Sequence, residues 1–131
     1  MKTQTIIIGA CRILAAAIML QTLYFKFSGS AESVYIFSQV GIEPWGRIGT
    51  GIAELIASVL ILIPRTSVFG AVMAIGIMLG AIATHIFILG IEVMGDAGQL
   101  FFYALTVLLC SIYLFWVQKQ QLFNLLKPKR P

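Results

Sequence analysis

Charged residues are scarce in this 131-residue chain. Asp, Glu, Lys and Arg together make up 11% of it, against roughly 25% in a typical soluble domain. Hydrophobic residues make up 60%, so too little polar surface remains to cover a globule in water. The scarcity of charge excludes an ordinary soluble domain and indicates a protein embedded in lipid.

Histidine and cysteine are scarcer still. With His85 as its one histidine, the chain cannot form a pair of histidine ligands to haem, and no cysteine at the same depth supports a metal site. Cys11 and Cys110 form no CxxC motif, and we interpret them as small buried apolar side chains. A redox pair is the alternative, if the first and last helices pack together. No hydrolase-like triad or phosphate loop is present, so we predict no catalytic residue and leave open whether the chain is an enzyme.

Alternation of apolar and polar residues with a period of two, the mark of a membrane β-barrel, is also absent. Long apolar runs in lipid form helices, because backbone polar groups must then be satisfied within the segment. A spanning helix needs roughly 20 residues, and four runs qualify: 5–25, 47–63, 68–90 and 98–118. The predicted fold is therefore an all-α membrane protein, a four-transmembrane-helix bundle forming a single domain over residues 1–131.

The connection between the first two spans is amphipathic. Ser30 suits the N-cap of a short helix over 31–39, and Gly41 suits its end. Apolar residues recur at helical spacing between them. We predict an interfacial amphipathic helix lying over the end of the bundle.

Small residues repeat every four positions in two of the spans. They let helices approach closely in lipid, and we predict that these two stripes are helix contacts. The stripes are Gly49, Ala53 and Ala57 in the second span, and Gly76, Gly80 and Thr84 in the third.

Positive charge is unevenly distributed. The basic residues at the chain ends and in the loop between the second and third spans are Lys2, Arg65, Lys119, Lys127, Lys129 and Arg130. The positive-inside rule then predicts a multi-pass protein of the cell inner (plasma) membrane with both termini in the cytoplasm, which agrees with an even number of spans. We interpret the basic tail as a topology signal beside anionic headgroups, and not as a nucleic-acid site.

Three ionisable residues nevertheless lie inside apolar runs: Arg12, Glu54 and His85. Each costs roughly 2.5–3.5 kcal/mol near the bilayer centre unless it pairs or lines a polar cavity. At 1.5 Å per residue, Arg12 and Glu54 fall about 10 and 14 Å from the cytoplasmic boundary. We therefore predict a buried ion pair between Arg12 and Glu54 that fixes the pairing of the first two helices.

A second polar layer is expected nearer the other face of the membrane. Gln21 and His85 both fall about 24–25 Å from the cytoplasmic boundary, with Thr84, Tyr103 and Lys26 close to that level. A histidine at this depth can exchange protons or hydrogen-bond a quinone-like headgroup. We predict these five residues as ligand-binding candidates with a quinone as candidate cofactor. The alternative is a structural histidine bonded to a helix carbonyl or to Gln21.

The chain resembles the DoxX-like family of small four-helix membrane proteins over roughly residues 11–116. At the end of the first helix the family's G-x-x-K-L run is replaced by Leu23-Tyr24-Phe25-Lys26-Phe27. The matching elements are Arg12, Phe25-Lys26-Phe27, Gly41-Ile42-Glu43-Pro44, Gly51-Ile52-Ala53-Glu54-Leu55 and Ala83-Thr84-His85.

This resemblance implies a four-helix bundle and, less directly, a function. Some relatives are linked to sulfur or thiol redox chemistry and to a thiosulfate:quinone oxidoreductase. Others act with redox partners in oxidative-stress complexes, and eukaryotic relatives assist the assembly of receptor channels.

Two functions of different classes follow. The leading hypothesis is an inner-membrane protein that binds a quinone or other lipid-like ligand in support of a membrane or periplasmic redox partner. The alternative is a non-catalytic assembly or chaperone subunit, motivated by the short chain and the lack of catalytic residues. A transporter is less favoured, because no inverted repeat or broken helix is visible. The expected partners are the lipid bilayer and a second copy of the chain, and not nucleic acid.

Overall fold

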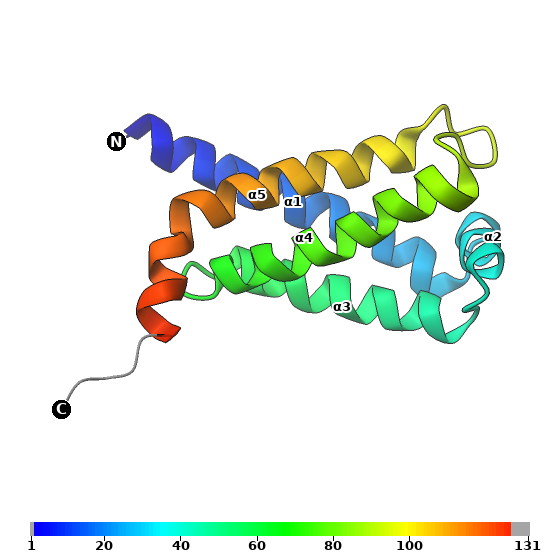
Figure 1. The fold of residues 1–131 in the computed structure, drawn as a ribbon, viewed down its shortest axis with the longest axis horizontal. Coiled ribbons are helices and arrows are strands. Elements are labelled where there is room, and N and C mark those ends of the chain that lie inside the picture. Colours follow the sequence, from blue (N-terminus) through cyan, green and yellow to red (C-terminus); the bar gives the residue numbers. More distant parts are fainter. Residues whose placement is uncertain (1, 127–131) are drawn as a thin grey trace.

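Five α-helices and one π-helical turn make up the computed structural model, which describes residues 2–126 (Figure 1). Within those residues there is no strand, and the helices that run through the bundle are long and apolar enough to cross a membrane. The predicted all-α, four-transmembrane-helix bundle is confirmed. In chain order the elements are α1 (Lys2–Ser28), α2 (Ala31–Val40), α3 (Trp45–Leu62), α4 (Ser67–Thr84), η1 (His85–Leu89) and α5 (Gln99–Leu126).

The long helices form a bundle in which α1 and α4 each pack mainly against α3 and α5. Helix α4 continues into the π-helical turn η1, so the third span runs from Ser67 to Leu89. The short helix α2 lies across one end of the bundle and contacts α1, α3 and η1, while α1 begins and α5 ends at the opposite end (Figure 1). The basic tail residues Lys127, Lys129 and Arg130 lie outside the described residues.

Helix α2 has the end residues that its sequence predicts. The Ser30 side chain accepts a hydrogen bond from the backbone N–H of Ser33 at 3.2 Å, which satisfies a donor that a helix start leaves free. Gly41 adopts the left-handed conformation with φ of 86°, and its N–H donates to carbonyls in the last turn. The predicted helix is confirmed, one residue longer than expected.

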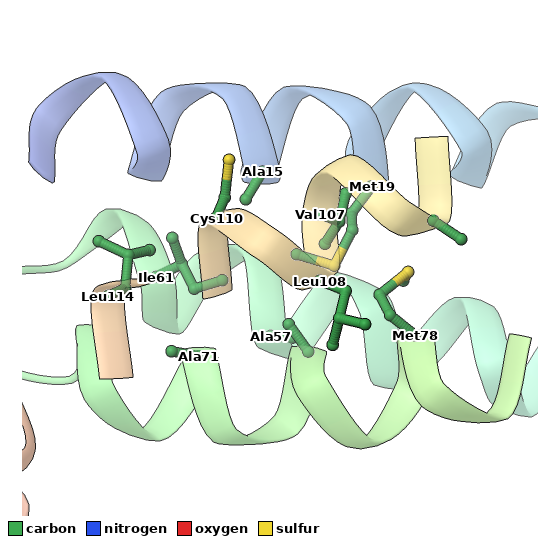
Figure 2. Packing of buried hydrophobic residues seen from close by; sticks show 12 residues of the cluster. Ala15, Met19, Ala57, Ile61, Ala71, Met78, Val107, Leu108, Cys110 and Leu114 are labelled. Atoms are coloured by element: carbon green, nitrogen blue, oxygen red, sulfur yellow. The ribbon is translucent and has the colours of Figure 1, made fainter. Parts of the chain in front are cut away.

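The bundle core consists of small and flexible apolar side chains from all four long helices (Figure 2). Because lipid tails are as apolar as the core, close packing and polar contacts hold membrane helices together more than exclusion from water does. Small residues are therefore useful in this core. Its fully or almost fully buried members include Ala15, Met19, Ala57, Ile61, Ala71, Ala74, Val107 and Leu114.

Helices α3 and α4 approach each other closely at Gly70. A Cβ atom added there would lie 2.6 Å from the backbone nitrogen of Ile61 and 2.8 Å from the carbonyl oxygen of Ala57. Both neighbours are backbone atoms of α3, which cannot move aside as a flexible side chain can. Gly70 thus sets the distance between these two helices.

The predicted small-residue stripes are only partly helix contacts. Ala57 is fully buried in the core, as expected. For Gly49, Gly76 and Gly80 the prediction is wrong, because a Cβ atom added at any of them would meet nothing within 4 Å. These three glycines border open space instead of a neighbouring helix.

The two cysteines lie on helices that pack together, α1 and α5. The thiols of Cys11 and Cys110 are free. Cys11 packs against the core cluster that contains Cys110, and the Cys110 sulfur points toward α1 (Figure 2). The helix packing on which a redox pair depends is therefore present. Both interpretations of the cysteines, apolar packing and redox pair, stay predictions.

Asp96 organises the loop that leads into α5. Its carboxylate accepts backbone hydrogen bonds from Val93 at 2.9 Å, Gly98 at 2.8 Å and Leu100 at 3.2 Å. Burial alone raises the pKa of Asp96, but these backbone donors, with His85 nearby, hold the pKa below its ordinary value. Asp96 therefore stabilises the fold at pH values above the ordinary carboxyl pKa. This stabilisation is lost as the pH falls through the lowered pKa of Asp96 in the folded protein.

Candidate functional site

A buried ion pair joins α1 to α3. Glu54 is 4% exposed, and its Oε1 lies 3.0 Å from Nζ of Lys26. Its second oxygen, Oε2, lies 2.9 Å from the Thr22 hydroxyl, whose single hydrogen is shared between this oxygen and the Met19 carbonyl at 2.8 Å. Thr22 and Lys26 are four residues apart on α1 and hence share a face. Both carboxylate oxygens are therefore satisfied, which is the condition for keeping a charge inside a bundle.

The predicted ion pair between Arg12 and Glu54 is wrong. Arg12 Nε donates instead to the Ile61 carbonyl at 3.1 Å and approaches the Ser67 hydroxyl at 3.3 Å. Arg12 precedes Thr22, the neighbour of Glu54, by ten residues, or about 15 Å along the helix. An arginine side chain cannot bridge that length.

Arg12 serves a different connection. The Ile61 carbonyl belongs to the last turn of α3 and Ser67 begins α4, so Arg12 ties α1 to the link between those helices. Carbonyls in the last turn of a helix lack partners within the helix, and a cation there is favourable. The Nη2 atom of Arg12 is buried and has no hydrogen-bond partner among residues 2–126.

A cavity of about 780 Å³ lies at the α2 end of the bundle, within the usual size range of small-molecule sites. It is lined by α1, α2, α3, α4, η1 and α5. Lys26 and Glu54 form part of its wall. All five residues predicted as ligand-binding candidates line this one cavity: Gln21, Lys26, Thr84, His85 and Tyr103.

Glu32 of α2 also lines the cavity and was missed by the sequence analysis. Its Oε1 is buried without a hydrogen-bond partner among the described residues. Burial, and to a lesser extent the charge of Asp96, raise the pKa of Glu32. The sequence did place Glu32 in the first turn of α2. Only the packing of α2 over the bundle, however, brings this residue to the cavity.

His85 begins the π-helical turn and is 5% exposed. Its Nδ1 lies 3.1 Å from the carbonyl oxygen of Gly90, whose N–H bonds in turn to the His85 carbonyl. The ring packs edge-on against Phe101 with centroids 5.8 Å apart. The histidine is thus bonded to the carbonyl of the residue that follows η1, and not to Gln21 or to a carbonyl within a helix, and it also lines the cavity.

The other candidates differ in what they can offer an occupant. The Thr84 hydroxyl donates to the Gly80 carbonyl of its own helix at 2.8 Å. The Tyr103 hydroxyl accepts from Gln99 Nε2 at 2.9 Å, so its own hydrogen stays available. Gln21 is exposed. Tyr103 is therefore the better hydrogen-bond donor of the two hydroxyl groups.

Glycine explains part of the cavity's volume. Gly49 of α3 and Gly76 and Gly80 of α4 all line it, and all three are exposed. A side chain at any of them would project into open space. The stripes of small residues thus make room between helices where the sequence suggested contact.

The part of the chain that the structure describes contains no group of three or more His, Cys, Asp and Glu side chains that could hold a metal ion.

The four-helix bundle, its capping helix and its polar cavity define a small multi-pass membrane protein. Residues 10–112 match the DoxX-like family, and the chain belongs to that family. No match was found among curated proteins or among solved structures.

Proposed function

We propose that this DoxX-like protein binds a quinone or another lipid-like molecule in its cavity, in support of a membrane or periplasmic redox partner. The observation that carries the proposal is the mixed lining of the cavity. Lys26, Glu54 and His85 provide polar groups, while Ile77 and Met78 belong to its apolar wall. Amphiphilic molecules with a polar head and an apolar body fit such a lining.

The polar groups of the cavity support this choice of ligand. A buried ion pair and a buried histidine are expensive at membrane depth, and such residues commonly mark functional sites. Lys26 has an exposed side-chain fraction of 15%, against 5% for Glu54, so Lys26 is the more accessible residue of the pair. It can donate a hydrogen bond to an oxygen of a bound headgroup.

Small molecules that co-purify with the protein in mild detergent test this proposal. We expect mass spectrometry to find a quinone or a specific lipid in the wild-type protein. It should be lost or depleted roughly tenfold or more in His85→Ala, because the cavity then lacks the ring that packs against Phe101 and forms part of its wall.

A cavity-filling variant provides a second arm of this experiment. Gly80→Leu adds a side chain where a Cβ atom meets open space, so the bundle should fold while the ligand is excluded. Ala17→Leu is the matched control, since Ala17 is exposed and lies outside the cavity lining. An identical lipid profile in all variants would contradict the proposal and favour the non-catalytic assembly or chaperone subunit.

We also propose that the protein lies in the cell inner membrane with both termini in the cytoplasm. The start of α1, the end of α5 and the α3–α4 connection lie at one end of the bundle (Figure 1), and Arg65 is in that connection. Basic residues favour the cytoplasmic side. Green fluorescent protein fused to either terminus is expected to fluoresce, and alkaline phosphatase inserted after Gly41 to be active. The reverse pattern would overturn this orientation.

A further inference from the structure

The hydrogen bond of His85 determines which of its two ring nitrogens is the acceptor. Its Nδ1 lies 3.1 Å from the carbonyl oxygen of Gly90, and a carbonyl oxygen only accepts, so Nδ1 must carry the hydrogen. A neutral imidazole has one donor and one acceptor. Its Nε2 is then the acceptor, and no residue among 2–126 donates a hydrogen bond to it.

We propose that His85 Nε2 accepts a hydrogen bond from a hydroxyl group of the molecule in the cavity, so that the site prefers a quinol to the corresponding quinone. This inference rests on the proposed function and names the redox form that the cavity binds. A quinone carries only carbonyl acceptors. A lone pair of its carbonyl oxygen would then face the lone pair of Nε2, and no hydrogen bond could form. The hydroxyl of a quinol supplies the missing donor.

Two donor groups of the cavity do not discriminate between the two forms. Lys26 has three N–H donors, and its ion pair with Glu54 occupies one side of the ammonium group. The Tyr103 hydroxyl accepts from Gln99 and keeps its hydrogen for donation. Both donors can bond either a quinone carbonyl or a quinol oxygen, so a preference for the reduced form arises at acceptors, which are His85 Nε2 and the unpartnered Oε1 of Glu32.

The test compares a short-chain ubiquinol with its quinone, bound anaerobically to the purified protein in nanodiscs. We expect the wild-type protein to bind the quinol about tenfold more tightly, because binding the quinone leaves a buried acceptor unpaired. His85→Phe keeps an aromatic ring without nitrogens and should lose most of this preference. Thr106→Val is the matched control and should keep the preference, since the Thr106 hydroxyl is bonded within its own helix and Thr106 lies outside the cavity lining.

A third ligand tests the inference without any substitution. The dimethyl ether of the same quinol keeps the ring and tail but has no hydroxyl hydrogen, so the wild-type protein should bind it as weakly as the quinone. Equal binding of quinol and quinone, or tight binding of the ether, would overturn the inference while leaving the proposed function in place. Failure of all three ligands to bind would count against quinone binding itself.

Discussion

Replacing Glu54 with leucine is expected to destabilise the protein by about 3–5 kcal/mol. The substitution removes the carboxylate that lies 3.0 Å from Lys26 Nζ and accepts a hydrogen bond from Thr22. The Lys26 ammonium then stays among the bundle helices without its counter-charge, which costs more than the pair itself contributes. Unfolding of the purified protein in mixed dodecyl maltoside and SDS micelles, followed by circular dichroism, measures the loss.

The double variant Lys26→Met/Glu54→Leu is the informative companion. Removing both charges leaves no unpaired ion, so most of the lost stability should return. Glu92→Leu, at an exposed loop position, is the control and should change stability by no more than about 0.5 kcal/mol. If the double variant is as unstable as the sum of its two single variants, the ion pair described here is wrong.

Replacing Gly70 with valine is expected to cost about 3 kcal/mol, the upper end of the usual range for overpacking. A Cβ atom at Gly70 lies 2.6 Å from the Ile61 backbone nitrogen and 2.8 Å from the Ala57 carbonyl oxygen. Because both are backbone atoms, relief requires α3 and α4 to move apart. The side chains packed between α3 and α4 would then lose contacts. The same unfolding measurement in mixed micelles reports the effect.

Gly76→Val provides the matched control on the same helix. A Cβ atom there meets nothing within 4 Å, and valine has a somewhat better helix propensity than glycine. We expect a change within about 1 kcal/mol, together with partial filling of the cavity that Gly76 lines. Equal destabilisation by the two substitutions would show that the cost of Gly70→Val comes from helix propensity and not from the close approach of α3 to α4.

The four long helices and the two ends of α2 were predictable because their causes are local, although α5 ends at Leu126, eight residues beyond the predicted span. An apolar run of sufficient length must be helical in lipid, and Ser30 and Gly41 mark the ends of α2 through contacts a few residues away. The gathering of the five candidate residues around one cavity was predictable for a related reason. Depth counted along each helix placed Gln21, His85 and their neighbours at one level, and that level is the α2 end of the bundle.

The partners of the buried charges were not predictable. The pairing of Lys26, and not Arg12, with Glu54 depends on the register between α1 and α3. Helix α1 has 27 residues and α3 has 18. Counting depth in both helices from an assumed membrane boundary therefore places one helix at the wrong height relative to the other. A shift of a few residues moves a side chain several ångströms along the axis and changes its partner.

The sequence by itself determined that this protein crosses the membrane four times, where its helices lie and which polar residues share a depth, because length, hydropathy and capping act within a segment. The tertiary structure decided that Glu54 pairs with Lys26, that Gly70 is the tight contact and that Gly49, Gly76 and Gly80 border a cavity. These features depend on the relative register and rotation of separate helices, which arise only when the whole bundle packs.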